Sequence, residues 1–403
     1  MKILHISPKL PYPTNDGGKI AIYGNLKYLK ERGHEIYFVA YKKDSDLNKC
    51  IPHLETLADI DVLEVDTENS ILGGILNLFS KVPYNVSKYH SQELKFHIIS
   101  LFKKKKFDIV IIENLHMGYI VDTIKSISSI PVVLRQHNLE MKIMKRFSEA
   151  EKNPLLKFYS ILQYKKFIKY EPELCEKFDK VVMITDHDKK EILELSNNIK
   201  STTIPAGVKK DLLTIEIKEK EPYSLFHIGH LDWFPNLDAI KYFLNEILPQ
   251  IVKKEPRTKF YIYGGMLPNG VVIPELVKEN VIQKGFVDDL WSDIADKQLA
   301  VVPLRIGSGM RLKIVELLAA GHNILSTSIG CEGINVEDKK HLLIADNKNE
   351  FAQIALDFFN GKYNSEAMIQ NGRKLIEDNY IWEKIAERFE QTFQKLISEN
   401  KNK

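Results

Sequence analysis

Cysteine is scarce in this sequence. The three cysteines, Cys50, Cys175 and Cys331, lie far apart among 403 residues and lack C-x-x-C spacing. This excludes a disulfide framework and a thiolate zinc site, and it fits a reducing compartment. Long apolar runs are lacking too, because the stretch at 71–79 is shorter than the roughly 20 apolar residues of a membrane span. Prolines also interrupt the apolar N-terminus early, which argues against a signal peptide, so we expect a cytoplasmic protein.

Net charge of one sign is also nearly absent, since 57 lysines and arginines face 54 aspartates and glutamates. The composition is 44% hydrophobic and 28% charged, which is typical of a folded globular protein. It excludes a disordered chain, a collagen-like fibre and a coiled coil. At roughly 100–200 residues per domain, the length predicts two domains or three.

Short apolar runs alternate with helical patterns along the chain. Residues 2–7 form the first run, a helical pattern covers 19–32, and the next run is 35–40. Continuous apolar strands separated by helices are typical of an α/β fold with a parallel sheet covered on both faces. Further strands are predicted at 108–113, 131–135, 180–185, 224–228, 259–263, 281–284, 299–304 and 323–326, and further helices at 237–251, 312–320, 351–360 and 381–397.

The alternation is interrupted at residues 206–222, where a turn-like segment leads into a charged stretch without periodicity. We interpret this region as a linker between two α/β units of similar size. The expected domains are residues 1–205 and 206–380, followed by a helical segment at 381–403. In each domain, the ligand site should lie at the carboxyl ends of the strands.

Two glycines, Gly17 and Gly18, stand where a loop meets the first predicted helix. They allow the backbone N–H groups of a helix N-terminus to approach an anion closely. A tight turn ending in an Asn or Asp N-cap explains the same residues. The pattern is not G-x-G-x-x-G, so it does not predict a dinucleotide site.

The polar segment LRQHNLE, residues 134–140, directly follows a predicted strand. His137 could donate a hydrogen bond to a sugar hydroxyl or a carbonyl, and Glu140 could pair with Arg135 or Arg146. A buried polar network that holds the loop is the alternative interpretation.

The most informative segment is PLRIGSGMRLKIVE at residues 303–316, where a Gly-Ser-Gly loop leads from a strand into a helix. Arg311 and Lys313 are cations near a helix N-terminus, which is unfavourable unless an anion binds there. Glu316 shares a helix face with Lys313 and can accept hydrogen bonds from two vicinal hydroxyls. The pattern predicts a nucleotide site, with the diphosphate at the loop and the ribose at Glu316. An i,i+3 salt bridge on a solvated helix is the alternative.

Two more loops follow predicted strands in the second domain. The loop at 229–236 contains Gly229 and His230 and is expected to lie over a ligand, unless its aromatic residues only pack the loop. The loop at 326–333 presents Glu332 as a candidate polar contact.

Together these segments resemble the retaining glycosyltransferases of the GT-B fold, in glycosyltransferase family four, the group 1 glycosyl transferases. The resemblance covers nearly the whole chain. It implies two Rossmann-like domains facing across a cleft, with an acceptor-binding first domain, a donor-binding second domain, and a C-terminal helix that packs back on the first domain. It is carried by PYPTNDGGKIAIYGNLKYLKERGHEI, LRQHNLE, FHIGHLDWFPNLDAI and PLRIGSGMRLKIVELLAAGHNILSTSIGCEGI.

The resemblance implies a retaining, metal-independent hexosyltransferase without a further cofactor. It would move a sugar from a UDP- or GDP-linked nucleotide-sugar donor to a glycan or lipid-linked glycan acceptor, in the synthesis of a surface polysaccharide or glycoconjugate. A non-catalytic nucleotide-sugar-binding subunit of a glycosyltransferase complex stays open as the alternative. It does so because the family's Arg…Lys pair after the first strand of the second domain is missing, and residues 229–236 stand there.

In the second domain, the resemblance assigns roles to residues of the Gly-Ser-Gly segment. Glu316 matches the family's second glutamate of E-x7-E, which binds the ribose hydroxyls. Lys313 and Arg311 would face the diphosphate. The position of the first glutamate is taken by Ser308, which leaves open which group contacts the sugar there.

In the first domain, Gly17 and Gly18 match glycines near the donor phosphate, and His137 matches a histidine near the transferred sugar. The D-x-D triplet at 59–61 lies in an acidic stretch without metal-binding context, and we interpret it as solvated. The catalytic candidates are therefore His137, Lys313, Arg311 and Glu316, and the donor-binding candidates are Gly17, Gly18, Gly229, His230, Ser308, Gly309, Lys313, Glu316 and Glu332.

The near-neutral total charge hides one basic region. Residues 86–170 hold 16 Lys and Arg against 7 Asp and Glu, a net charge of +9, so the rest of the chain carries 3 − 9 = −6. The apolar stretch 71–79 precedes this region. Basic and apolar surface together suit peripheral attachment to an anionic membrane, here the inner face of the plasma membrane, with Lys103–Lys106 as the proposed anchor. A solvated basic surface is the alternative, and no recognition motif points to nucleic acid.

Overall fold

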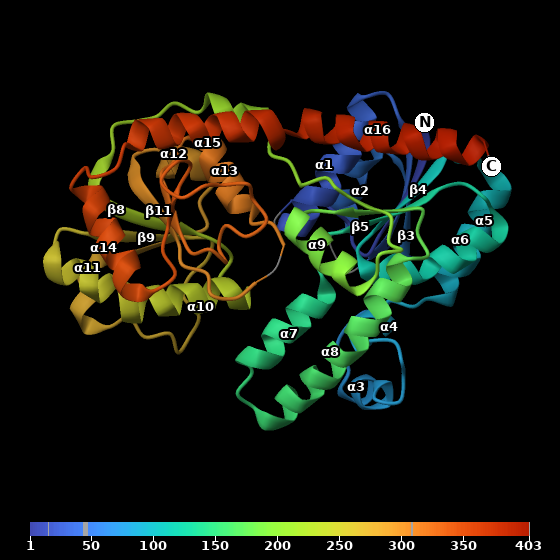
Figure 1. The fold of residues 1–403 in the computed structure, drawn as a ribbon, viewed down its shortest axis with the longest axis horizontal. Helices are drawn as coiled ribbons and strands as arrows, with labels where there is room; N and C mark the ends of the chain where they lie inside the picture. Colours follow the sequence, from blue (N-terminus) through green and yellow to red (C-terminus); the bar gives the residue numbers. More distant parts are fainter. Residues whose placement is uncertain (15, 43–46, 308, 403) are drawn as a thin grey trace. The chain divides into compact units, whose positions relative to one another are not determined.

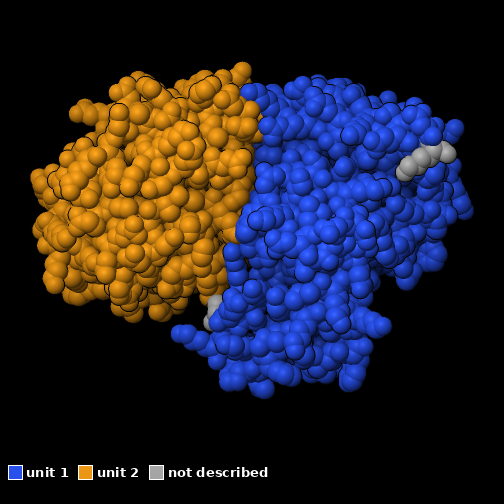
Figure 2. Space-filling model, in the orientation of Figure 1, with its two compact units in different colours: residues 1–207, 382–403 blue, residues 208–381 orange. Residues whose placement is uncertain are grey.

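The computed structural model describes residues 1–14, 16–42, 47–307 and 309–402. The chain divides into two compact units. Unit 1 comprises residues 1–207 and 382–403, and unit 2 comprises residues 208–381 (Figure 2). Unit 2 is therefore inserted in the chain between two segments of unit 1.

Unit 1 is built on a seven-stranded sheet in the order β3-β2-β1-β4-β5-β6-β7, and all its pairings are parallel. The inner strands consist almost entirely of buried residues, as expected for a sheet with helices on both faces. The strands are β1 (Lys2–Ser7), β2 (Glu35–Lys42), β3 (Asp59–Glu64), β4 (Ile109–Glu113), β5 (Val132–Gln136), β6 (Lys180–Met183) and β7 (Ser201–Thr203).

The helices of unit 1 include a long hairpin, α7 and α8, which projects from the sheet with the short helix α3 beside it (Figure 1). The helices are α1 (Gly17–Glu31), α2 (Leu47–Glu55), α3 (Ile71–Asn77), α4 (Tyr84–Ser87), α5 (Gln92–Lys104), η1 (Leu115–Ile120), α6 (Val121–Ile127), α7 (Glu140–Ala150), α8 (Pro154–Cys175), α9 (Asp186–Leu195) and α16 (Trp382–Lys401).

Unit 2 has a parallel six-stranded sheet in the order β10-β9-β8-β11-β12-β13. Its strands are β8 (Glu221–Ile228), β9 (Lys259–Tyr263), β10 (Val281–Gly285), β11 (Lys297–Val302), β12 (Ile324–Ser326) and β13 (Leu343–Ile344). Its helices are η2 (Lys210–Thr214), α10 (Phe234–Tyr242), η3 (Phe243–Ile247), α11 (Leu248–Lys254), η4 (Glu275–Asn280), α12 (Leu290–Ile294), α13 (Leu312–Ala320), α14 (Lys348–Phe359) and α15 (Ser365–Asn379).

The strand order reverses once in each sheet. In unit 1 the reversal lies between β1 and β4, and in unit 2 it lies between β8 and β11. The loops that leave the carboxyl ends of two such neighbouring strands diverge, and they leave a crevice in which ligands bind. The fold therefore directs attention to the loops after β1, β4, β8 and β11.

The C-terminal helix α16 packs on α1, as the resemblance implied. Trp382 fixes this contact: a Cβ atom on Gly24 of α1 would lie only 2.1 Å from the Trp382 ring. Arg32 Nε also donates to Glu390 Oε2 at 2.9 Å. The predicted pair of parallel Rossmann-like sheets and the returning helix are thus both confirmed.

The local predictions differ from the structure in a few places. No strand is predicted at 59–61, where β3 starts and pairs with β2, although the Asp59 side chain is exposed, as its interpretation as solvated implies. The single helix predicted at 237–251 is three consecutive segments, because a π-helical turn at Phe243–Ile247 separates α10 from α11. Helices α2 to α9, α12 and α15 and strands β3, β7 and β13 have no counterpart among the predicted elements.

Candidate functional site

The first candidate site lies in unit 2, at the loops that follow β8 and β11. Gly229, directly after β8, has no room for a side chain, since a Cβ there would lie 2.7 Å from Lys313 Nζ. Gly264, at a φ of +96°, would place its Cβ 2.6 Å from the Gly229 carbonyl oxygen. The glycines therefore let the backbone after β8 approach the lysine at the start of α13.

Lys313 is held by a short polar chain. Its Nζ donates to Asn236 Oδ1 at 2.9 Å, and Asn236 Nδ2 donates to the His230 carbonyl at 2.9 Å. Burial, helped by the nearby Arg311 charge, lowers the pKa of Lys313 to about 7. Burial and the Arg311 charge destabilise the charged form of Lys313. An anionic ligand bound beside the lysine would stabilise that form.

Glu316 lies one turn further along α13. Burial raises the pKa of its carboxyl group to about 7, against a lowering effect of Lys209. Within the described part of the chain, the carboxylate makes no ion pair with Lys313, which bonds to Asn236 instead. The i,i+3 salt bridge considered from the sequence is therefore not formed, and Glu316 keeps its acceptor atoms for another partner.

Two glycines with positive φ precede α13. Gly307 and Gly309 have φ values of +145° and +74°, which are rarely accessible to other residues. Arg311 Nη1 donates to the Gly309 carbonyl at 2.8 Å. Ser308, one of the predicted donor-binding residues, lies outside the described residues.

The other candidates of unit 2 border the same edge of the sheet. The His230 ring lies beside Phe286, with centroids 5.2 Å apart. Trp233 and Phe234, considered above as packing the loop, are instead 62% and 54% exposed. Glu332 lies in the loop after β12 and is half-buried.

The second candidate site lies in unit 1, where β1, β4 and β5 end. Glu113, the last residue of β4, is buried between two histidines. Its Oε1 lies 2.8 Å from His5 Nε2, and its Oε2 lies 2.6 Å from His137 Nε2. Burial favours a protonated carboxyl group, yet the Arg135 charge and the two histidine bonds hold the pKa of Glu113 well below its usual range.

Arg135 completes this buried cluster. Its Nη1 lies 3.6 Å from Glu113 Oε1 and donates to the Ala21 carbonyl at 3.0 Å. Its guanidinium also stacks over the Phe389 ring of α16. The pair considered between Arg135 and Glu140 is therefore wrong. Arg135 pairs with the buried Glu113 on the neighbouring strand. Glu140 Oε2 instead lies 3.8 Å from His116 Nε2.

His137 is buried at the rim of the cluster. Burial lowers the pKa of its imidazole, while Glu113 acts in the opposite direction. The imidazole therefore keeps its proton on Nε2 and donates a hydrogen bond to the Glu113 carboxylate, which fixes the orientation of the ring. The segment thus forms a buried polar network, which was the alternative interpretation from the sequence. The same network fixes the orientation of the His137 ring.

Gly17 and Gly18 begin α1 beside an ion pair. Asp16 is the N-cap, since its side chain accepts from Lys19 N at 2.8 Å, and Lys9 Nζ donates to both carboxylate oxygens at 2.9 Å. A Cβ on Gly18 would lie 3.3 Å from Lys9 Nζ. The N-cap explanation is therefore confirmed. Through its bond to Asp16, Lys9 also lies at the N-terminus of α1.

Four residues of these sites were missed in the sequence: His5, Lys9, Glu113 and Asn236. Glu113 carried a detectable signal, because it is a charged residue at the end of the apolar run DIVII. His5 interrupts an apolar strand in the same way. Lys9 lies in a loop and Asn236 lies in the first turn of α10, and for both only the fold reveals the partners.

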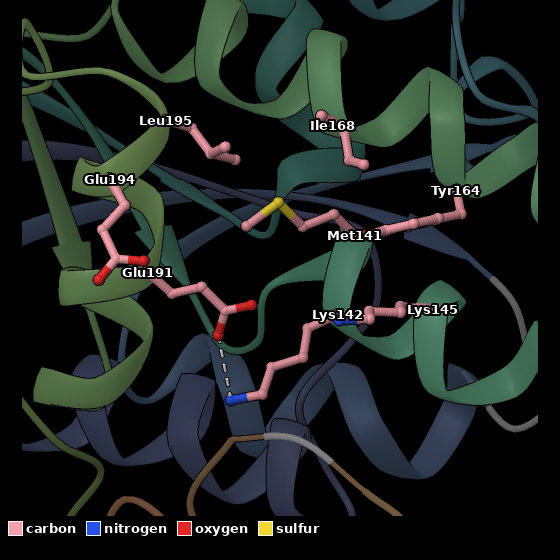
Figure 3. Close-up of a pocket in the computed structure, with 8 residues that line it drawn as sticks. All are labelled: Met141, Lys142, Lys145, Tyr164, Ile168, Glu191, Glu194 and Leu195. Carbon is pink, nitrogen blue, oxygen red and sulfur yellow. Dashed lines mark ion pairs between the residues drawn. The ribbon is translucent and has the colours of Figure 1, made fainter. Parts of the chain in front are cut away.

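A further hollow in unit 1 lies at the base of the hairpin, between α7, α8 and α9 (Figure 3). Lys142 points into it and pairs with Glu191 at 3.3 Å. The cavity holds about 130 Å³, less than the roughly 300 Å³ at which ligand pockets begin. It is too small for a nucleotide, and the ion pair within it fixes α7 to α9.

The carboxylates of the D-x-D triplet are engaged with neighbouring side chains. Asp59 accepts from Lys105 Nζ at 2.7 Å, and Asp61 accepts from the Tyr37 hydroxyl at 2.5 Å. Among the residues that the structure describes, no group of three His, Cys, Asp or Glu side chains is placed to hold a metal ion.

Comparison with known proteins finds similarity to glycosyltransferases. Residues 222–360 match the family model of the glycosyl transferases group 1. This segment, which lies within unit 2, is similar to the group 1 glycosyltransferases. It contains β8, β11 and α13, and with them the candidate residues from Gly229 to Glu332.

Relatives extend the similarity over nearly the whole chain. An uncharacterized 44.6 kDa protein in the cps region of Klebsiella pneumoniae is 24% identical over 396 residues, which cover 95% of this chain and 97% of the relative. Sucrose-phosphate synthase from Thermosynechococcus elongatus matches with a TM-score of 0.72 at 15% identity, over 99% of both chains. HepE from Anabaena, solved in complex with UDP, matches with a TM-score of 0.68 at 13% identity, over 98% of this chain and 100% of HepE. The fold is GT-B, as predicted.

The hydropathy of the chain adds one observation. None of the helices in the described residues is both long enough and apolar enough to cross a membrane.

Proposed function

We propose that this protein is a glycosyltransferase that moves a hexose from a UDP- or GDP-linked donor to a glycan or lipid-linked glycan acceptor, with retention of anomeric configuration. Unit 2 binds the donor and unit 1 binds the acceptor. The observation that carries the proposal is Lys313, a lysine whose pKa falls to about 7 beside a glycine-lined backbone at the strand-order reversal of unit 2. An anionic diphosphate would restore its charge and turn an unfavourable burial into a favourable ion pair.

The donor contacts follow from the position of each residue. Lys313 and Arg311 bind the diphosphate together with Ser308 and the N–H groups around Gly309. Glu316 accepts hydrogen bonds from the ribose hydroxyls through a carboxylate that lacks an ion-pair partner among the described residues. Gly229, His230 and Glu332 complete the donor site from the neighbouring loops.

The residues of unit 1 act on the transferred sugar and its phosphate. His137, oriented by Glu113, donates or accepts a hydrogen bond at the sugar. The helix N-terminus at Gly17 and Gly18 approaches the phosphate with its N–H groups and with the nearby Lys9.

The reaction exchanges one bond at the anomeric carbon. The acceptor hydroxyl oxygen attacks on the face that the nucleotide leaves, and the bond from the anomeric carbon to the phosphate oxygen breaks. Its electron pair stays on the β-phosphate, which takes the acceptor's proton. Lys313 and Arg311 stabilise the charge that develops there, which is the contribution that electrostatic catalysis makes in many enzymes. This route needs neither a metal ion nor a protein base.

The acceptor class is supported by the Klebsiella relative, whose gene lies in a cps, or capsular polysaccharide, region. A cytoplasmic enzyme of such a pathway would extend a glycan carried on a membrane lipid. We therefore place the protein in surface polysaccharide or glycoconjugate synthesis, and propose a peripheral position at the inner face of the plasma membrane.

A panel of UDP-, GDP- and dTDP-sugars tests the proposal. Binding of the correct donor raises the Tm by mass action, and slow release of free nucleotide reports hydrolysis of that donor in the absence of acceptor. Stabilisation without any nucleotide release would instead indicate a non-catalytic nucleotide-sugar-binding subunit. No stabilisation by any nucleotide would overturn the donor assignment.

A further inference from the structure

Helix α3 of unit 1 has its apolar face turned outward. Ile71, Leu72, Ile75 and Leu76 form one stripe along the helix, and all four are exposed, with Ile71 at 87%. Phe79 continues the stripe and is 91% exposed. A helix packed on a globular protein normally buries its apolar stripe, so this orientation requires another explanation.

The inward face of α3 is made of small and polar residues. Cβ atoms on Gly73 and Gly74 would lie 3.1 Å and 3.4 Å from the hydroxyls of Tyr84 and Tyr159. Asn77 is buried, and its Oδ1 accepts from Gln163 Nε2 at 3.2 Å. These contacts fix α3 against α8, so the outward stripe is built into the fold.

The tip of the α7–α8 hairpin carries a second group of exposed apolar side chains. Leu155, Leu156 and Phe158 occupy the first turns of α8, with exposures of 81%, 52% and 64%, and Phe147 lies near the end of α7. Residues 155, 156 and 158 point in different directions around the helix, because successive residues are rotated by about 100°. The apolar surface of the tip is therefore convex.

These two groups lie on one side of unit 1. Tyr159, next to Phe158 in α8, contacts Gly74 of α3, and Figure 1 shows α3 beside α8. Ten of the 20 large apolar side chains that are exposed in the described residues fall in segments 71–79 and 147–158. Scattered apolar residues need no explanation, but a concentrated patch marks an interaction surface.

The charge around the patch is positive. Residues 140–170 contain 8 Lys and Arg and 3 Asp and Glu, a net charge of 8 − 3 = +5. Lys152 and Lys157 are exposed at the tip itself, and Lys81 is exposed directly after the α3 stripe. Apolar side chains flanked by lysines suit a surface that is anionic outside and apolar beneath.

The lysine run at 103–106, the anchor considered from the sequence, lies elsewhere. Lys105 Nζ bonds to Asp59, the first residue of β3, and therefore marks the amino edge of the sheet. Segment 71–79 follows the carboxyl end of β3, and the hairpin follows the carboxyl end of β5. The run and the apolar patch thus belong to opposite edges of the parallel sheet.

We propose that α3 and the hairpin tip insert together into the interfacial region of an anionic lipid bilayer. This inference extends the proposed function, in which the acceptor is carried on a lipid. A protein partner would be expected to cover one face, whereas the exposed side chains at the tip point around the whole helix. A fluid phase can surround such a tip on all sides, and the lysines would meet the lipid phosphates. The proposal commits to a bilayer, and a protein partner or second copy is an outcome of the test.

Co-sedimentation with vesicles tests this surface. The full chain is expected to bind vesicles of phosphatidylglycerol mixed with phosphatidylcholine. It should bind vesicles of phosphatidylcholine alone at least about tenfold more weakly. The tip variant Leu155→Ser/Leu156→Ser/Phe158→Ser should bind the anionic vesicles at least about tenfold more weakly. The α3 variant Ile71→Ser/Leu72→Ser should also bind the anionic vesicles more weakly than the wild type does.

Two further variants separate the surface from general effects of charge and apolarity. Lys152→Gln/Lys157→Gln should weaken binding by about tenfold or more, because each lysine near an anionic surface contributes roughly fivefold. The matched control Phe96→Ser/Val272→Ser/Leu276→Ser removes three equally exposed apolar side chains elsewhere and should bind as the wild type does.

Several outcomes would overturn the proposal: no binding of the wild type to anionic vesicles, unchanged binding of the tip variant, or a dimer in sedimentation velocity that the tip variant abolishes. The last outcome would assign the surface to a second copy. Release of nucleotide from the donor in the absence of vesicles is expected to be unchanged in the tip variant. A failure of docking is thereby distinguished from a failure of the proposed function, since only the latter removes nucleotide release from the wild type.

Discussion

Glu113 Oε2 lies 2.6 Å from His137 Nε2, inside a cluster that also contains His5 and Arg135. The carboxylate thus joins the strand β1 to the segment after β5 and fixes His137, the histidine that we propose contacts the transferred sugar. A group that orients a histidine without contacting the substrate acts as a positioning residue.

Glu113→Gln should therefore affect both stability and turnover. The amide leaves the buried Arg135 without its counter-charge, and breaking a buried pair costs about 3–5 kcal/mol. We expect the Tm to fall, and in the protein that remains folded we expect kcat to fall more than KM rises, because His137 loses its fixed orientation. Steady-state kinetics below the Tm of the variant measures this. A variant that is destabilised yet keeps the wild-type kcat would show that the cluster is only structural.

Glu171→Gln is the matched control for this variant. Glu171 is also buried in unit 1, but burial raises its pKa to about 8, despite hydrogen bonds from the N–H groups of Met141 and Glu140. Both of its oxygens accept hydrogen bonds from N–H groups, so the NH2 group of the amide must face one of these donors. We expect a loss of about 1–3 kcal/mol in the free energy of unfolding. We expect kcat to be unchanged in the folded protein, because in the part of the chain that the structure describes Glu171 makes no hydrogen bond to His137.

Lys313→Met should remove most of the donor-dependent activity. The lysine lies at the predicted diphosphate position, and the loss of one group that stabilises developing charge costs about 10²–10³ in kcat. The exposed Lys241 of α10, replaced in the same way, is the control and should keep wild-type activity. Equal thermal stabilisation of Lys313→Met and wild type by the donor would contradict the assignment.

Glu316→Gln should change how stability depends on pH. The pKa of Glu316 is about 7 in the folded protein and near 4.5 in the unfolded chain, so between these values the folded state binds more protons. Stability therefore falls as pH rises from 4.5 to 7, and the amide removes this loss. The difference in the free energy of unfolding between variant and wild type should be about 2–3 kcal/mol larger at pH 8 than at pH 5.

Urea unfolding at these two pH values checks the expectation. The exposed Glu366→Gln variant of α15 is the control, and its difference from the wild type should be the same at both pH values. A Glu316→Gln difference that does not change with pH would show that the carboxyl group is not desolvated.

Gly24→Ala should destabilise unit 1. The new methyl group would lie 2.1 Å from the Trp382 ring, so α16 must shift, and overpacking of this kind costs about 1–3 kcal/mol. Gly74→Ala is a matched helical control, since its nearest neighbour, the Tyr159 hydroxyl, lies at 3.4 Å. The control should be neutral or slightly stabilising. A wild-type Tm for Gly24→Ala would show that the contact between α1 and α16 is loose.

The strands and the glycine-rich loops could be predicted because each depends on local sequence. The predicted helix 312–320 coincides with α13, since its apolar spacing and the glycine at 321, with a φ of +82°, define both its face and its end. Contacts between the first turns of different helices, such as α10 and α13, are different. Asn236 and Lys313 are 77 residues apart, and only the order β8-β11 brings them together.

Helix α3 shows a further limit of local patterns. The stretch ILGGILNLF could be recognised as apolar, but its two glycines weaken the helical pattern and its apolar stripe faces away from the core. Sequence reasoning assumes that apolar residues are buried. Where a fold turns them outward, as here, the assumption fails, and the position of the segment must come from the structure.

The return of the chain to unit 1 has a consequence for synthesis of the protein. Phe389 and Phe393 of α16 are fully buried in unit 1, yet they are translated after the whole of unit 2. On the ribosome, unit 2 can complete its sheet first, while the sheet of unit 1, although made earlier, waits for its covering helix. A chain that is released early near residue 381 would thus carry an intact carboxyl-terminal unit and an unfinished amino-terminal one.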